Sequence, residues 1–213
     1  MVLLVLAAVA VPVGIVLALF VAPVEAVQGE PYRILYVHVP SVTAAYLAFT
    51  VTFVASVVYL LTRRIRVDRL AAVSAEIGQV FLTIVLLTGP IWGKPVWGVW
   101  WTWDARLTTA LVLWFIFAGY LMLRAWAGPQ GARAAAVVAI AGFLDIPLIH
   151  WSAVLLRTLH PPPTVFRPEG PALPPSMLVI LSVNTAAFLL AYFAFLTVRM
   201  RQEALRDLQE AAP

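Results

Sequence analysis

The residues best suited to chemistry lie between positions 92 and 103, where the chain places five of its eight tryptophans. Indole is a large, flat, apolar ring with one N–H donor, so such a cluster can form a wall for a flat aromatic guest. An interfacial aromatic belt is the alternative, but a belt usually places only one or two rings at each helix end. We therefore predict a site for a macrocycle-sized ligand, built from Trp92, Lys94, Trp97, Trp100, Trp101, Trp103, Asp104 and Arg106.

The composition indicates which elements must hold this segment. The 213 residues are 63% hydrophobic and 11% charged, whereas soluble domains carry roughly 25% charged residues. Stretches apolar enough to cross about 30 Å of hydrocarbon as helices recur along the chain. We predict an all-α integral membrane protein, one domain over 1–213 with a tryptophan-rich loop at about 89–108 on the outer face. Its bundle of six transmembrane helices would span 2–21, 41–62, 74–88, 107–124, 134–152 and 176–198.

The basic residues predict the orientation of the bundle. Nine lie in the second and fourth connections and the C-terminal tail, and the remaining five lie in the other three connections. Since Lys and Arg mark the cytoplasmic side, both termini are predicted to be cytoplasmic. The net charge of +4 then follows from topology and does not indicate nucleic-acid binding. The absence of cysteine excludes a disulfide framework and a thiolate metal site.

Three histidines, His38, His150 and His160, all fall at or near predicted outer ends of spans. Pro40 could open the helix that follows His38. One histidine at a helix end is usually interfacial, but two approaching a tryptophan-walled pocket from opposite sides suit iron protoporphyrin, whose axial positions bind imidazole. Zinc is a weaker interpretation, because no HExxH spacing or further His or Cys ligand is offered. The heme propionates would need cations, and four lie on the same predicted face: Arg33, Lys94, Arg106 and Arg157.

Two carboxylates fall within predicted spans, where charge is costly and often functional. Asp145 lies five residues before His150, on a different helical face. It could support the site from behind or pair with another helix. Glu76 lies near the cytoplasmic end of the third predicted span, and we interpret it as structural.

The segment from Trp92 to Asp104 resembles the tryptophan-rich "WWD" signature of the heme-handling superfamily. With six predicted spans and this length, the chain resembles the CcmC (heme exporter protein C) family, and the segments around His38 and from Pro147 to His160 are similar to that family as well. The resemblance implies that His38 and His150 ligate the iron of a transiently bound heme b (iron protoporphyrin IX), while the tryptophans form its platform. It also implies a multi-pass protein of the bacterial cytoplasmic (inner) membrane. Heme would be held on the periplasmic face and delivered to the heme chaperone CcmE, with CcmA, CcmB and CcmD as partner subunits and membrane lipid around the bundle.

This resemblance favours an assembly factor over an enzyme, and two other classes remain as alternatives. A bis-histidine cytochrome b subunit would carry histidines at two depths, whereas all three here are predicted on one side. A heme transporter or permease would need a polar path through the bundle. Only Glu76, Gln79 and Asp145 could contribute to one.

Overall fold

In a computed structural model, which describes residues 1–156, 159–160, 165 and 170–210, the chain is a bundle of helices. No strand occurs among those residues; they contain one isolated bridge, between Glu25 and Gly29. The α-helices are α1 (Val2–Val16), α2 (Leu35–Thr62), α3 (Ile65–Trp97), α4 (Ala105–Ala127), α5 (Ala132–Phe143), α6 (Asp145–Leu155) and α7 (Pro175–Glu210). A π-helical turn, Leu17–Val21, continues α1, and 3₁₀ turns Glu30–Ile34 and Gly128–Gly131 precede α2 and α5.

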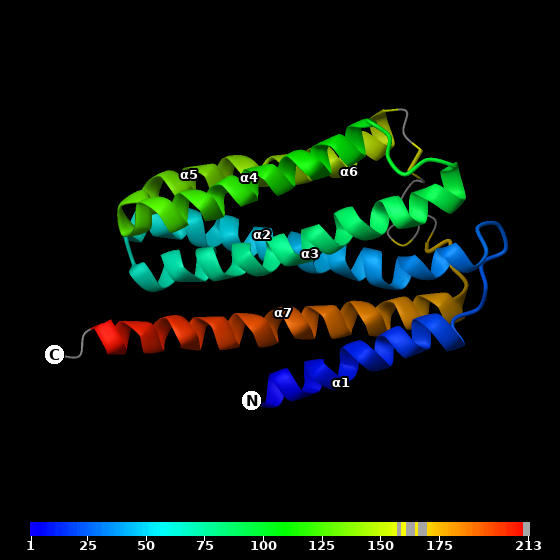
Figure 1. Ribbon diagram of the computed structural model, residues 1–213, viewed down its shortest axis with the longest axis horizontal. Helices are drawn as coiled ribbons and strands as arrows, with labels where there is room; N and C mark the ends of the chain where they lie inside the picture. The colour runs from blue at the N-terminus through cyan, green and yellow to red at the C-terminus, as the bar shows by residue number, and fades with distance from the viewer. Residues whose placement is uncertain (157–158, 161–164, 166–169, 211–213) are drawn as a thin grey trace.

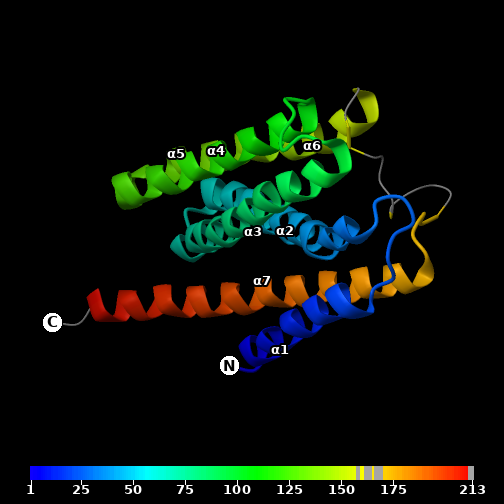
Figure 2. The ribbon, with the colours of Figure 1, turned by 45° about the vertical axis from the view of Figure 1, so that its right-hand side comes forward.

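The helices form three layers along a common long axis (Figures 1 and 2). In both views α1 lies beside α7, the pair α2 and α3 occupies the middle, and α4 lies beside α5 and α6. Both chain termini lie away from the end of the bundle at which α3 connects to α4 (Figure 1). The segments predicted to carry chemistry therefore gather at one end of the molecule.

Five stretches of the described residues are long and apolar enough to cross a membrane: Val2–Val21, Glu30–Thr62, Ile65–Trp97, Ala105–Ser152 and Pro175–Arg206. The protein is thus a multi-pass membrane protein, but the predicted count of six spans is not confirmed. The fourth stretch contains α4, the turn at Gly128–Gly131 and the returning helices α5 and α6. Pro147 explains why α5 and α6 are separate, because it has no N–H for the carbonyl of Phe143, where α5 ends.

The predicted boundaries of the third span and of the tryptophan-rich loop are wrong. Helix α3 runs beyond Thr88 to Trp97, through Pro90 and Pro95, so the non-helical connection covers only 98–104. Gly98 ends α3 in the left-handed conformation, at φ 78°, and its N–H bonds the Lys94 carbonyl at 3.0 Å. Asp104 begins α4, accepting a hydrogen bond from the Leu107 N–H at 3.0 Å.

Small residues allow the middle layer to pack closely. A Cβ added to Gly78 on α3 would lie 2.8 Å from Phe49 on α2, so only glycine fits there. Phe49 in turn stacks on Phe117 of α4, with the ring centroids 3.9 Å apart. Ser74 donates to the Ala48 carbonyl at 2.8 Å and lies 2.8 Å from the Tyr192 hydroxyl, which connects α3 to α2 and α7. These contacts fix α2 against α3, the two helices that carry His38 and the first tryptophans.

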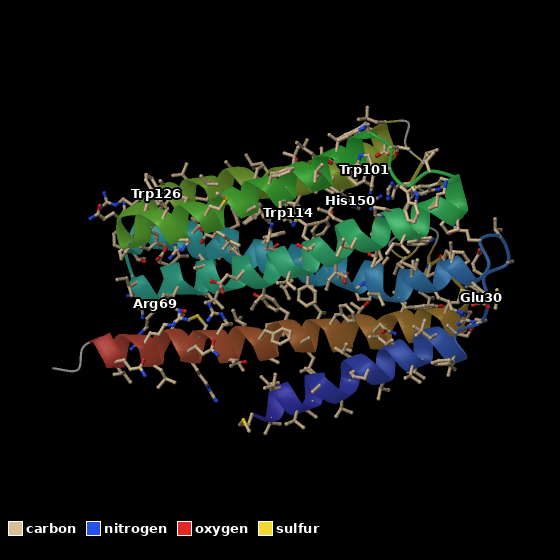
Figure 3. The ribbon with its side chains drawn as sticks, in the orientation of Figure 1. Glu30, Arg69, Trp101, Trp114, Trp126 and His150 are labelled. Atoms are coloured by element: carbon tan, nitrogen blue, oxygen red, sulfur yellow. The ribbon has the colours of Figure 1, made fainter. Side chains whose placement is uncertain are left out.

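Ion pairs join the helices toward the other end of the bundle, where Figure 3 labels Arg69 and Trp126. Arg124 makes a bidentate contact with Asp68, at 2.7 and 2.8 Å. Arg199 bonds Glu76 at 2.7 Å, so this carboxylate pairs with another helix, as its structural interpretation required.

Candidate functional site

A cavity with about 590 Å³ of empty space, counted out to its open mouth, lies where α2, α3, α4 and α6 meet. The lining residues that carry polar groups are His38 and Tyr46 on α2, Trp101 in the 98–104 connection, Arg106 at the start of α4, and His160. The apolar part of its lining includes Val42, Leu82, Val85, Leu86, Leu107 and Ile149.

His38 lies inside the first turns of α2. The predicted position before the helix, with Pro40 as the opening residue, is wrong, because α2 begins at Leu35 and Pro40 is inside it. The Nδ1 atom of His38 lies 2.8 Å from the Thr88 hydroxyl on α3. The Trp92 ring meets the imidazole edge to face, with centroids 5.9 Å apart. Contacts from α3 therefore hold the ring in one orientation.

His160 lies on the same cavity although it is 122 positions further along the chain. Its Nδ1 is 4.0 Å from an Asp104 carboxylate oxygen, and its ring lies 5.0 Å from that of Trp97. Burial and, to a smaller extent, the charge of Arg106 lower the pKa of His160 to about 4, although the charge of Asp104 acts in the opposite direction. At neutral pH the imidazole is therefore neutral, and its contact with Asp104 is not an ion pair. Neutral imidazole is the form that coordinates a metal.

His150 is exposed and does not line this cavity. Its neighbour Ile149 does, and successive residues on a helix point about 100° apart, so the two side chains take different directions. Figure 3 labels His150 and Trp101 toward the same end of the bundle. Of the three histidines, the structure thus brings together His38 and His160, not the pair His38 and His150 that the family resemblance implied.

The five clustered tryptophans divide into two groups. Trp101 lines the cavity, and its buried indole Nε1 has no hydrogen-bond partner among the described residues. Trp92 and Trp97 lie on α3 and pack against His38 and His160, respectively. Trp100 and Trp103 are 59% and 75% exposed. The cluster therefore supplies one ring to the cavity, one to each imidazole, and two to the surface.

Of the three predicted cations that the structure describes, Arg33, Lys94 and Arg106, only Arg106 lines the cavity. Arg33 donates to the carbonyls of Ala18 and Ala22, at 2.9 and 2.7 Å, and so fastens the end of the first helix. The Lys94 ammonium group bonds the Gly98 carbonyl at the end of α3. Arg157 lies outside the described residues. Asp104, besides beginning α4, accepts a hydrogen bond from Thr102 at 3.0 Å, so it shapes the connection.

Thr88, the hydrogen-bond partner of His38, is not among the predicted site residues. The prediction ended the third span at this residue and gave it no role. A helix continued to Trp97 would have placed Thr88 and Trp92 on one face, since residues four apart are neighbours on a helix surface. Both indeed contact His38.

Comparisons with a family model and with individual proteins indicate the same family. The family model described as "Heme exporter protein C" matches residues 1–212. The chain is 38% identical to heme exporter protein C of Haemophilus influenzae over 92% of this chain and 80% of that protein. It is 37% identical to heme exporter protein C of Escherichia coli, over 84% of this chain and 73% of that protein. A cytochrome c biosynthesis ccmC-like mitochondrial protein of Marchantia polymorpha is 36% identical over 89% of this chain and 81% of its own length. The chain therefore belongs to the heme exporter protein C (CcmC) family.

Proposed function

We propose that this protein handles heme for cytochrome c maturation by holding it at the cavity between His38 and His160 and passing it to a periplasmic heme chaperone. Family membership supports heme handling in cytochrome c biogenesis. The observation that carries the finer proposal is the lining of one cavity by two imidazoles, an indole and a guanidinium.

Each of these groups suits a part of heme, which is cargo here. The two imidazoles can bind the iron through nitrogen, as in known heme proteins. The Trp101 ring offers an apolar surface to the macrocycle, and the apolar lining excludes water from it. Arg106 can bind a propionate through a charge-assisted hydrogen bond. The cargo is thereby proposed to be heme b, iron protoporphyrin IX.

The surface around the cavity suits transfer to another protein. Trp100 and Trp103 are exposed next to the cavity-lining Trp101, and exposed aromatic rings are enriched at protein interfaces. We assign this rim to the heme chaperone CcmE, with CcmA, CcmB and CcmD as the other subunits. The basic residues at the opposite end support a cytoplasmic location for that end, and we propose that the cavity faces the periplasm of the bacterial inner membrane.

Two of the three polar residues that could line a permease path are bonded to other helices. Glu76 pairs with Arg199, and the Gln79 amide donates to the Trp114 carbonyl at 3.1 Å. Asp145 is 8% exposed, and its Oδ2 has no hydrogen-bond partner among the described residues. One such carboxyl does not make a polar path through the bundle.

Three alanine variants test the ligand assignment. The purified wild type, His38→Ala, His150→Ala and His160→Ala would each be titrated with ferric heme, and the absorption spectrum would be recorded. We expect the low-spin spectrum to be lost in His38→Ala and His160→Ala and kept in His150→Ala, which is the matched control. Loss in His150→Ala with retention in His160→Ala would restore the pair that the resemblance implied. Retention in all three would refute ligation by histidine.

A further inference from the structure

A short chain of hydrogen bonds leads away from His38 into helix α3. The Nδ1 atom of His38 lies 2.8 Å from Oγ1 of Thr88. The same hydroxyl lies 2.7 Å from the backbone carbonyl of Ile84, one turn earlier on α3, and 3.3 Å from that of Val85. Nε2 of His38, the other ring nitrogen, makes no hydrogen bond with the described residues.

Counting protons decides the direction of this chain. A threonine hydroxyl has one hydrogen to donate, and the carbonyl of Ile84 can only accept. The Thr88 hydroxyl donates this hydrogen to the Ile84 carbonyl oxygen, at 2.7 Å. The 2.8 Å contact between Thr88 and His38 can then be a hydrogen bond only if Nδ1 of His38 is protonated and donates to the Thr88 oxygen. In a neutral imidazole with Nδ1 protonated, Nε2 carries a free lone pair.

We infer that Thr88 is a positioning residue, which holds His38 in the Nδ1-protonated tautomer so that Nε2 is available to the heme iron. The effect of Thr88 on iron binding rests on the proposed function. The tautomer of His38 does not, because it is a property of the heme-free protein. A ligating histidine commonly donates its other N–H to an oxygen, which fixes the ring and makes the ligand more basic. Here the acceptor is itself a hydrogen-bond donor, so the two bonds polarise each other.

The packing of α2 and α3 makes this arrangement rigid. The tight contact of Gly78 with Phe49 fixes the spacing of the two helices. Trp92, one turn after Thr88, covers the His38 ring edge to face. With both contacts on α3, the imidazole cannot rotate without breaking one of them. Thr88 therefore sets both the proton position and the plane of the ring.

Nitrogen NMR of the heme-free protein tests the tautomer directly. The chain has only three histidines, so a sample labelled with ¹⁵N-histidine gives few signals, and His38→Ala identifies those of His38. We expect wild type to show a protonated Nδ1 and a bare Nε2 at neutral pH. Thr88→Val should shift the population toward the Nε2-protonated form, and Thr88→Ser should restore the wild-type signals. A protonated Nε2 in the wild type would overturn the inference.

The consequence at iron is measured by heme affinity and midpoint potential. Losing such a partner of a metal ligand typically costs about 10- to 100-fold in affinity, so we expect a loss of that size in Thr88→Val. A basic imidazole favours ferric iron, so the ferric affinity should fall more than the ferrous one. A tenfold difference between them would raise the midpoint potential by about 59 mV.

Thr185→Val is the matched control, because the Thr185 hydroxyl makes the same bond within its helix, to the Leu181 carbonyl at 2.8 Å, and contacts no histidine. It should leave the NMR signals, affinity and potential unchanged. If His38→Ala keeps its heme spectrum, the proposed ligation fails while the tautomer result stands. If His38→Ala loses heme but Thr88→Val matches wild type in all three measurements, the role of Thr88 is refuted.

Discussion

Replacing Arg106 by glutamine should weaken heme binding through the loss of one propionate contact. Arg106 lines the cavity and its charge acts on His160, so it lies close enough to affect a bound anion. A hydrogen bond to a charged group contributes about 1.5–3 kcal/mol. At about 1.4 kcal/mol for each factor of ten, the expected loss is about 10- to 150-fold in Kd. We expect a loss near the lower end of this range, because Arg106 is partly exposed and solvent screens its charge.

The assay should remove the contact in two ways, by changing Arg106 in the protein and by changing the carboxylate of the ligand. Wild type and Arg106→Gln would each be titrated with heme and with its dimethyl ester, which has no carboxylate. Wild type should bind the ester more weakly than heme, whereas Arg106→Gln should discriminate less between them. Lys94→Gln is the control, since the Lys94 ammonium group bonds the end of α3 and does not line the cavity. Equal discrimination by wild type and Arg106→Gln would refute the contact.

Two further predictions concern packing and the tryptophans. A Cβ at position 14 would lie 2.6 Å from the Asn184 amide oxygen, so Gly14→Val should separate α1 from α7 and cost about 1–3 kcal/mol, seen as a lower melting temperature in detergent. Val13→Ala changes an exposed neighbour and should melt like wild type, and equal melting of all three proteins would contradict the argument. Trp101→Ala should weaken binding of iron-free protoporphyrin, measured by fluorescence titration, because Trp101 lines the cavity. Trp103→Ala, at a residue 75% exposed, should not, and the reverse order would show that the cavity is not the porphyrin site.

The helical, membrane-spanning nature of the chain follows from composition and the length of its apolar stretches. The first predicted span, 2–21, coincides with the first apolar stretch, Val2–Val21. The end of α3 could not be predicted in this way, because Gly89, Pro90, Gly93 and Pro95 are typical helix-ending residues. Tertiary contacts override that local preference: Trp92 packs on His38 and on Tyr32, and its indole N–H donates to Gln28 at 2.8 Å.

The spacing of histidines in the sequence does not show which of them lines the cavity together with His38. Which face of α6 carries His150 is set by where that helix begins, and the break at Leu144 separates it from α5. His160 lies beyond the end of α6 and reaches the cavity through contacts with Asp104 and Trp97. Such contacts between distant segments have no local signal. Histidine, tryptophan and arginine at the cavity could therefore be expected from the sequence, but the pairing of His38 with His160 there could not.

The density of tryptophan near the cavity has a more specific cause than a wall for a flat guest. If all five rings served that wall, all would line the cavity, yet only Trp101 does. Trp92 and Trp97 instead pack on His38 and His160, so each imidazole has its own indole at an edge-on angle. Both indoles come from the last turns of α3, so one helix end orients two histidines that lie far apart in sequence. A helix that stopped at Thr88, as its glycines and prolines suggest, would lose both contacts. Extending α3 to Trp97 therefore organises the pair of imidazoles as well as the tryptophans themselves.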